Sequence, residues 1–502
     1  MSITVDGTTR ATTFSLTRYE GDGVTLTAPE TFDTAGGRLT FRHWMLDDRI
    51  LFPTGVNALP FTLLRDGTLT AVYTPEDGPG VCRFTVEATF DDRDANPGDG
   101  VCAGGQGPCT LRAAIQEANA LPGACLITVP PGTYTLAFTG ANENAAATGD
   151  LDVTDDLTIL GAGADVTIVD GNGLDTVFDI LPDTTVEIYG LTIRGGNGSG
   201  TPGGVDNEGT LTLGNCVIAD NAASGNGGGV WNTGTMTLRN CRVAENTADL
   251  NGGGLYNRYG TLTLIDTEVI SNTAELFAGG GLANNAGTVV LERSTVSGNN
   301  AGSEGGGIWN DSTLTLVNST LSGNAAETGG GGLFNRGHAV NLNNVTIADN
   351  TVFKGDGGGV ENVGTLNLKN TLIAGNVDGS GAAPDCGGTM NSQGYNLIQN
   401  PSGCTLSGDT TGNLLGVDPL LGPLADNGGA TRTHALLPGS PAIDAGNPAA
   451  PGSGGNACAA TDQRGVARPQ GTACDIGAYE AVGPEGEIPL ARQNVYLPLI
   501  IR

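Results

Sequence analysis

Two acidic residues in this 502-residue sequence have the type and spacing that acid–base chemistry needs. Asp220 and Glu245 occupy equivalent places in adjacent copies of an internal repeat, so we expect their backbones to lie about 5 Å apart. Polysaccharide lyases and hydrolases need paired carboxylates, often with Ca²⁺ and an Arg or Lys base. However, Arg242 is the nearest cation in the sequence, and two acids at a solvated turn are the commoner meaning of such a pair.

A second group near the C-terminus has the composition of a catalytic set: Arg432, His434, Asp444, Asp462, Arg464, Asp475 and Glu480. Ion pairs that lock a C-terminal cap onto the last coil account for these residues equally well. The whole chain has three histidines, which gives a Ser-His-Asp arrangement little support. We therefore assign no catalytic residue, and the sequence favours a protein without enzymatic activity.

Aromatic residues recur at one outward place in the repeat, directly after its glycines. In four of seven copies this place holds Trp231, Tyr256, Trp309 and Phe334, and in the others Asp206, Ala283 and Glu361. An outward row of flat side chains suits sugar rings, so these four aromatics are the candidate ligand-binding residues. The alternative is that the rings stack on one another or lie under a loop.

A calcium site is the only cofactor that the sequence suggests. The segment DDRDANPGDGVC spaces Asp92, Asp94, Asn96 and Asp99 so that their oxygens can converge on Ca²⁺. The acid that closes an EF-hand loop is absent, because Ala103 stands at that place. A solvated acidic turn is the alternative interpretation.

These residues are carried by a glycine-rich repeat that runs from Gly203 to Asn376. Two asparagine markers keep one period of 25 to 27 residues through seven copies. The first marker is Asn207, Asn232, Asn257, Asn284, Asn310, Asn335 and Asn362, and the second is Asn221, Asn246, Asn272, Asn299, Asn324, Asn350 and Asn376. A unit this short cannot bury an apolar face alone, so its copies must stack as a solenoid.

The pattern inside each copy has a period of two, which is typical of strands. In the GTLTL segments, for example, Leu211 and Leu213 point one way and Thr212 points the other. Three strands per copy predict three parallel sheets around an aliphatic core, which is an all-β, right-handed parallel β-helix rising about 4.8 Å per coil. Stacked asparagines are expected to hydrogen-bond from coil to coil and to accept left-handed backbone angles.

Composition divides the chain into five segments. Residues 1–80 predict a small β-sandwich, 81–126 a disulfide-containing transition with a capping helix, 127–415 the β-helix, 416–482 a C-terminal cap module, and 483–502 a tail. In the capping helix, Leu111, Ile115 and Ala118 share one face and Thr110 is the expected N-cap. Such a helix would cover the open edge of the first coil.

Ten cysteines without nearby histidines indicate disulfides rather than zinc, and therefore an oxidising compartment. The expected pairs are Cys102/Cys109, Cys386/Cys404, Cys458/Cys474 and, flanking the first, Cys82/Cys125. Cys216 and Cys241 share an inward position of adjacent coils and are expected to be small core residues, with a bridge between them as the alternative.

The net charge of −31 disfavours nucleic acids and anionic membranes as partners. No apolar run approaches the roughly 20 residues of a transmembrane helix. No leader is visible at Met1, so export would require a signal peptide that this sequence does not include.

Four segments resemble known families. CTLRAAIQEANA is similar to the C-S-L-R-E-A-I motif of bacterial surface β-helix proteins, with Ala114 in place of the usual Glu. The Gly-Gly-Gly and S-G-N repeats resemble those of polymorphic outer-membrane proteins and autotransporter passengers. Within residues 377–482, GVDPLLGPLADNGGATRTHALLPGSPAIDAG and CDIGAYE resemble the choice-of-anchor Q module, and Phe41, Trp44 and Thr70 to Tyr73 resemble small β-sandwich repeats of bacterial surface proteins.

The resemblances imply a secreted or surface protein with no catalytic activity. Together with the repeat they predict an exported, extracellular protein of a bacterial cell surface that acts as an adhesin, a stalk or a surface-structure component. Its expected partners are glycans or other surface proteins. Two alternatives stay open: a polysaccharide lyase or glycoside hydrolase on a β-helix, and a subunit that self-associates into a filament or sheath.

Overall fold

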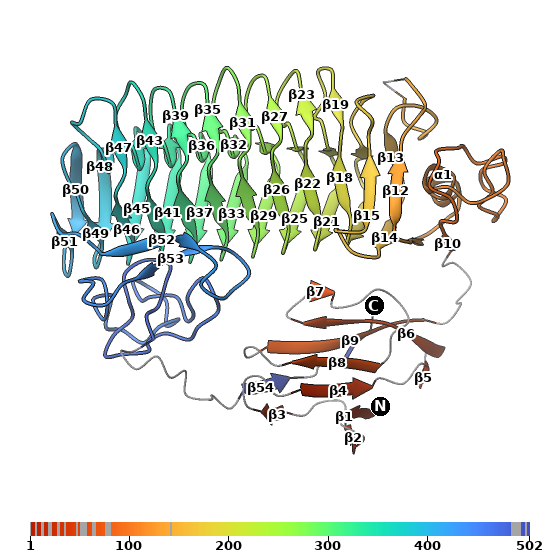
Figure 1. Cartoon of the computed structure of the whole chain (residues 1–502), viewed down its shortest axis with the longest axis horizontal. Helices are drawn as coiled ribbons and strands as arrows, with labels where there is room; N and C mark the ends of the chain where they lie inside the picture. The colour runs from red at the N-terminus through yellow and green to blue at the C-terminus, as the bar shows by residue number, and fades with distance from the viewer. Residues whose placement is uncertain are drawn as a thin grey trace.

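The computed structural model of the chain describes residues 82–140 and 143–482 (Figure 1). Outside these ranges only backbone strands are assigned: β1 to β9 within Ser2–Pro75, β54 (Gln493–Tyr496) and β55 (Leu499–Ile501). The predicted β-sandwich of residues 1–80, including Trp44, and the tail of residues 483–502 therefore lie outside the described residues.

The described residues form a parallel β-helix, as predicted. Strands of successive coils pair in parallel to build a 22-stranded and a 12-stranded sheet, which run the length of the stack in Figure 1. A third, 8-stranded sheet spans only the coils from β19 (Asn197–Gly198) to β47 (Val377–Asp378). A typical coil consists of β28 (Leu255–Arg258), β29 (Thr261–Ile265), β30 (Glu268–Ile270) and β31 (Thr273–Ala274). The period-two pattern is confirmed, because Leu262 and Leu264 are buried in this coil while Thr263 between them is half-buried.

Each repeat coil therefore contains four strands rather than the predicted three. The first two strands of a coil belong to one sheet, the 22-stranded one, and the fourth strand is a two-residue segment that forms the 8-stranded sheet. In β31 the second residue, Ala274, is fully buried. This fourth strand was missed because two residues with one small apolar side chain are too short for a readable alternation.

The asparagine ladders are confirmed and lie inside the stack. In the first ladder Asn207 Nδ2 donates to Asn232 Oδ1 at 2.7 Å, and in the second Asn272 Nδ2 donates to Asn299 Oδ1 at 3.0 Å. The left-handed angles do not fall on these asparagines. They fall on the residue before the second ladder, such as Asp220 with φ +54°, and on a separate column that includes Asn215 with φ +52°.

The first coil is covered by the short helix α1 (Leu111–Ala120), as the sequence predicts. The side chain of Thr110 caps the helix by accepting from the backbone N–H of Ala113 at 3.2 Å. Arg112 is fully buried and forms an ion pair with Asp91 at 2.8 Å. The helix thereby closes an otherwise open sheet edge.

All four expected disulfides are present: Cys82–Cys125, Cys102–Cys109, Cys386–Cys404 and Cys458–Cys474. Cys216 and Cys241 are free and buried, as expected for core residues. Four disulfides are typical of an extracellular protein. Among the described residues, no helix is long and apolar enough to cross a membrane.

The C-terminal module lies beside the coils, against the outer face of the 12-stranded sheet (Figure 1). Its regular structure is a hairpin of β52 (Leu421–Ala425) and β53 (Thr433–Leu436). Arg432 pairs with Glu268 in β30, and Thr320 in β38 (Thr320–Ser322) donates to Gln463 at 2.7 Å. The module thus contacts several coils and does not sit only on the last one.

Candidate functional site

A single outward column of residues runs along the first strand of each coil. The strands are β13 (Leu151–Val153), β16 (Phe178–Ile180), β20 (Val205–Asn207), β24 (Val230–Asn232), β28, β32 (Leu282–Asn285), β36 (Ile308–Asn310), β40 (Leu333–Asn335) and β44 (Val360–Asn362). In the register of these strands, one residue of each strand is the direct partner of one residue in the next. From the first coil to the last these residues are Asp152, Asp179, Asp206, Trp231, Tyr256, Ala283, Trp309, Phe334 and Glu361. We call these nine residues the ladder. It joins the four predicted aromatics to acidic residues at both ends.

The aromatic part of the ladder is only partly open to solvent. Trp231 and Trp309 are half-buried, whereas Tyr256 and Phe334 are each 6% exposed. Trp231 and Tyr256 meet edge to face, with ring centroids 5.1 Å apart. The two tryptophans thus offer ring surface to a ligand, while the other two rings mainly support them.

Polar neighbours orient the rings. The phenol oxygen of Tyr256 accepts from Asn285 Nδ2 at 3.0 Å, and Trp309 Nε1 donates to Glu304 Oε2 at 3.3 Å. A half-buried ring whose polar atom is already bonded loses little rotamer freedom when a ligand binds. The arrangement suits recognition of a flat, partly polar group.

Acidic groups gather at the N-terminal end of the ladder. One carboxylate oxygen each of Asp150, Asp152 and Asp179 lies within 4.8 Å of the others. Burial, followed by repulsion between the acids, raises the pKa of Asp150 to about 8. Burial likewise raises the pKa of Asp152 to about 7 and that of Asp179 to about 6. The next rung, Asp206, has its pKa raised to about 7 by burial and by Asp179.

A second acidic group closes the other end. Glu361 lies near Asp356 and Glu304, and burial together with these two charges raises its pKa to about 7. Glu304 and Asp356 come from the turns before β36 and β44, and both pair with Gly329 as isolated bridges. The aromatic rungs are therefore bounded by carboxylates on two sides, which favours cationic or hydroxyl-rich ligands over anions.

The predicted calcium loop is held together by its own backbone. Asp92 accepts from the backbone N–H of Gln106 at 2.9 Å, and Asp94 accepts from that of Asn96 at 2.7 Å. Asp99 accepts from Asn96 Nδ2 at 3.1 Å and from the backbone N–H of Val101. These oxygens are already partnered, and a calcium ion at this loop stays a prediction.

The acid pair considered first lies at exposed turns. Asp220 and Glu245 are both exposed, both have left-handed backbones, and Glu245 lies 3.8 Å from Arg242. Solvated carboxylates of this kind lack the buried surroundings that tune an acid for catalysis. The arrangement is that of a solvated turn.

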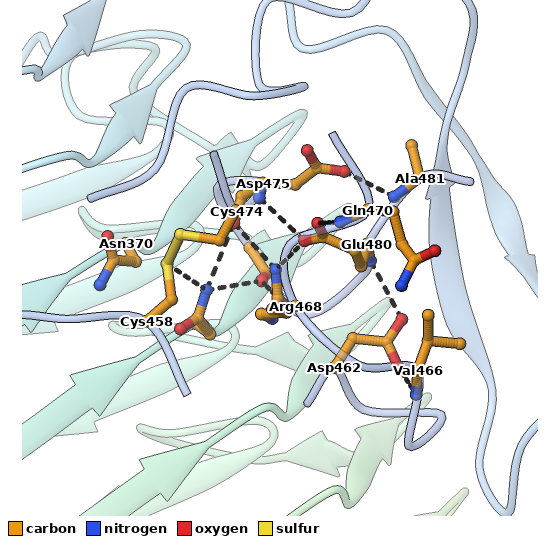
Figure 2. Close-up of polar contacts among 12 residues, drawn as sticks. Asn370, Cys458, Asp462, Val466, Arg468, Gln470, Cys474, Asp475, Glu480 and Ala481 are labelled. Carbon is orange, nitrogen blue, oxygen red and sulfur yellow. Dashed lines mark hydrogen bonds and ion pairs between the residues drawn. A yellow bond between two sulfur atoms is a disulfide. The ribbon is translucent and has the colours of Figure 1, made fainter. Parts of the chain in front are cut away.

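Three residues of the C-terminal set, Asp462, Asp475 and Glu480, belong to a buried network (Figure 2), whereas Asp444 is exposed and Arg432 is half-buried. Arg468, which the sequence analysis did not single out, pairs with Glu480 at 2.7 Å, and neither side chain is exposed. Glu480 also accepts from the backbone N–H groups of Gln470 and Asp475, and Asp462 accepts from that of Glu480. Because these polar atoms bond to one another, the network locks the module rather than offering a reactive group.

His434 contacts the β-helix but lacks the surroundings of a catalytic base. Its Nε2 lies 2.8 Å from Ser322 Oγ, and its Nδ1 lies 2.8 Å from the carbonyl oxygen of Gly422. Both Ser322 and His434 are buried, at 3% and 2% exposure. A substrate has no access to this pair, which instead joins β53 to β38.

Sequence reasoning missed the acidic group at Asp150, Asp152 and Asp179. The glycine and asparagine markers that align later coils are absent from residues 127–178, so Asp152 and Asp179 could not be placed in one column with Asp206. A usable signal was present: LDV at Leu151–Val153, FDI at Phe178–Ile180 and VDN at Val205–Asn207 share one pattern of an acid between two inward residues.

Comparison with known proteins assigns this chain to no family. No protein-family model and no curated protein matches the chain. Among solved structures, the pectate lyase Pel9A is similar, with 16% identity and a TM-score of 0.47 over 80% of this chain and 97% of that one. At this identity and TM-score the likeness carries no argument about this chain.

Proposed function

We propose that this chain is an exported, non-enzymatic protein of a bacterial cell surface that binds saccharide chains along the ladder, as an adhesin or stalk. The observation that carries the proposal is the register of Trp231 and Trp309, which are half-buried rungs of one column three coils apart. At the usual strand spacing this separation is about 14 Å. An extended polymer lying along the column would meet both rings.

Several properties support the surface location. Four disulfides fit an oxidising exterior, and the resemblance of residues 377–482 to a choice-of-anchor module fits attachment at the cell surface. The coils form an extended stack, and Trp231 and Trp309 of the ladder are partly open to solvent on its side. An extended stack that carries a lateral binding face is suited to holding a ligand away from an anchor.

Intrinsic fluorescence tests the glycan-binding proposal directly. The chain has three tryptophans, of which two are rungs of the ladder. In a Trp44→Phe background, titration with glycans chosen from an array should change the emission of Trp231 and Trp309. Replacing both by Ala removes the reporter tryptophans, so the affinity of this variant is measured by calorimetric titration. It should be at least about tenfold weaker, since an aromatic contact contributes about 0.5–1.5 kcal/mol beyond its buried area.

A matched control is Phe353→Ala, which removes an exposed aromatic ring that is not a rung of the ladder. This variant should bind as the parent does. A blank array, or equal binding by the double alanine variant, would remove glycan binding from the proposal. Release of products from a polysaccharide panel would instead support the lyase or hydrolase alternative, and polymers in negative-stain images would support the filament alternative.

A further inference from the structure

We propose that Asp150, Asp152 and Asp179 form a Ca²⁺ site at the N-terminal end of the ladder. Asp152 and Asp179 are direct partners in the parallel pair β13–β16, and Asp150 directly precedes β13. The three side chains bring one oxygen each to within 4.8 Å of the others. Oxygens on opposite sides of a Ca²⁺ ion are about 4.6–5.2 Å apart, so one ion can reach all three.

An unsatisfied buried oxygen points to a missing partner at this place. Asp152 has no exposed surface, and its Oδ2 accepts from the backbone N–H of Ala146 at 2.6 Å. Its Oδ1 is also buried, and within the described part of the chain it has no hydrogen-bond partner. A carboxylate oxygen can only accept, so its burial is costly without a donor or a cation.

The nearest protein cation cannot serve as that partner. Arg112 uses its guanidinium on Asp91 and on the backbone carbonyls of Ala146, Gly149 and Asp150, at 2.8 to 3.1 Å. These bonds hold the loop before β13, and the Arg112 guanidinium makes no hydrogen bond or ion pair to the side chains of Asp150, Asp152 and Asp179. The same bonds position the acids in advance, which lowers the entropic cost of binding an ion.

The ligand set selects the kind of ion. All three side chains offer hard carboxylate oxygens, which suit Ca²⁺ or Mg²⁺ and not the nitrogen and sulfur sites of zinc. Ca²⁺ accepts six to eight oxygens in flexible geometry, whereas Mg²⁺ demands near-ideal octahedral geometry at about 2.1 Å. Asp150 and Asp179 are half-buried, so water can reach the ion and complete its shell.

This site is distinct from the loop of Asp92 to Asp99. There the carboxylates accept hydrogen bonds from nearby N–H groups, whereas Asp152 keeps a buried oxygen free of any. The new site also does not depend on saccharide binding by the tryptophans. It would neutralise the first rungs of the ladder and tie the covering loop to the first coils.

Calorimetric titration of the full chain with Ca²⁺ after EDTA treatment tests the proposal. We expect binding of one ion, weaker binding of Mg²⁺, and a higher thermal midpoint in the presence of Ca²⁺. Asp179→Asn and Asp150→Asn should each lower Ca²⁺ affinity at least about tenfold, because even outer-shell changes at metal sites cost 10–100-fold. Asp165→Asn, which changes an exposed acid, is the matched control and should leave the affinity unchanged.

The outcomes separate the possibilities. If Asp99→Asn abolishes binding while Asp179→Asn does not, the ion occupies the other loop and the proposal is wrong. If the parent binds no Ca²⁺ at millimolar concentration, it is wrong as well. Far-ultraviolet circular dichroism of each variant shows whether lost binding reflects lost folding. If Asp179→Asn unfolds, Asp150→Asn carries the test, since its side chain precedes the strand.

Discussion

Asn299 provides the sharpest test of what holds the coils together. It is 1% exposed in the second asparagine ladder, and its Oδ1 accepts from the backbone N–H of Asn272 at 2.9 Å and from Asn272 Nδ2 at 3.0 Å. Its own Nδ2 donates to the carbonyl oxygen of Val269 at 3.0 Å and to Asn324 Oδ1 at 2.9 Å. Asn299→Ala removes all four bonds.

The expected loss of stability depends on which hydrogen-bonding groups lose their partner. The buried N–H of Asn272 loses the Asn299 acceptor, and an unsatisfied buried donor costs about 1–3 kcal/mol. The other three bonds contribute about 1 kcal/mol each, although such terms are not strictly additive. We therefore expect Asn299→Ala to lower the free energy of unfolding by about 4 kcal/mol, a large share of the stability of a typical domain.

A matched control lies on the outer face of the same stack. Asn367 Nδ2 donates to Asn341 Oδ1 at 2.9 Å and its Oδ1 accepts from Asn391 Nδ2 at 2.8 Å, but these bonds are exposed. Water can replace them, so Asn367→Ala should cost less than about 1 kcal/mol. Denaturant unfolding gives the two free energies, and hydrogen exchange shows whether Asn299→Ala opens the adjoining coils first. Equal costs at the two positions would refute the inference that the inner ladder clamps the coils.

Two further predictions concern charged groups. Arg112→Met leaves the buried Asp91 carboxylate without its partner and should destabilise the protein by about 3–5 kcal/mol in thermal or denaturant unfolding, whereas Arg194→Met breaks a partly exposed pair and should cost under about 1 kcal/mol. Glu361 has a folded pKa of about 7, above its ordinary value of 4.5, so folding takes up a proton between these values and stability falls as pH rises through them. Glu361→Gln should flatten that slope and raise stability above pH 7 by about 1–2 kcal/mol after allowance for solvent screening. An unaltered slope in Glu361→Gln would contradict the assignment.

The β-helix was predictable because stacking forces one residue type to recur at one place. The regular asparagine intervals predict the length of one coil and the parallel register between coils. The alternation of Leu211, Thr212 and Leu213 predicts which side chains face inward. Similarly, the close cysteine pairs and the cap at Thr110 are local features that sequence spacing reports. Structural features that are local or periodic can therefore be predicted from a single sequence.

Features that depend on contacts between distant segments of the chain were harder to predict from the sequence. The position of the C-terminal module beside the coils depends on contacts such as the hydrogen bond between Thr320 and Gln463. These two residues are separated by 143 positions in the sequence, and the repeat period does not relate them. The exposure of the aromatic rungs also could not be predicted, since it depends on neighbouring turns of irregular length. Asp152 was missed for another reason: the glycine and asparagine markers are absent from its coil, although the pattern that it shares with Asp179 and Asp206 was a usable signal.

The parallel register has a consequence for how such a chain can change length. Every repeat coil presents nearly the same donors and acceptors on its upper and lower edges, so duplication of one coil recreates the interface that it interrupts. The number of coils between β30 and β46 (Leu372–Ala374) is constrained further, because the C-terminal module contacts Glu268, Thr320 and Asn370, which lie on different coils of this section. Insertions should therefore be accepted among the earlier coils, between β20 and β28, where they would lengthen the rod while the section in contact with the module keeps its spacing.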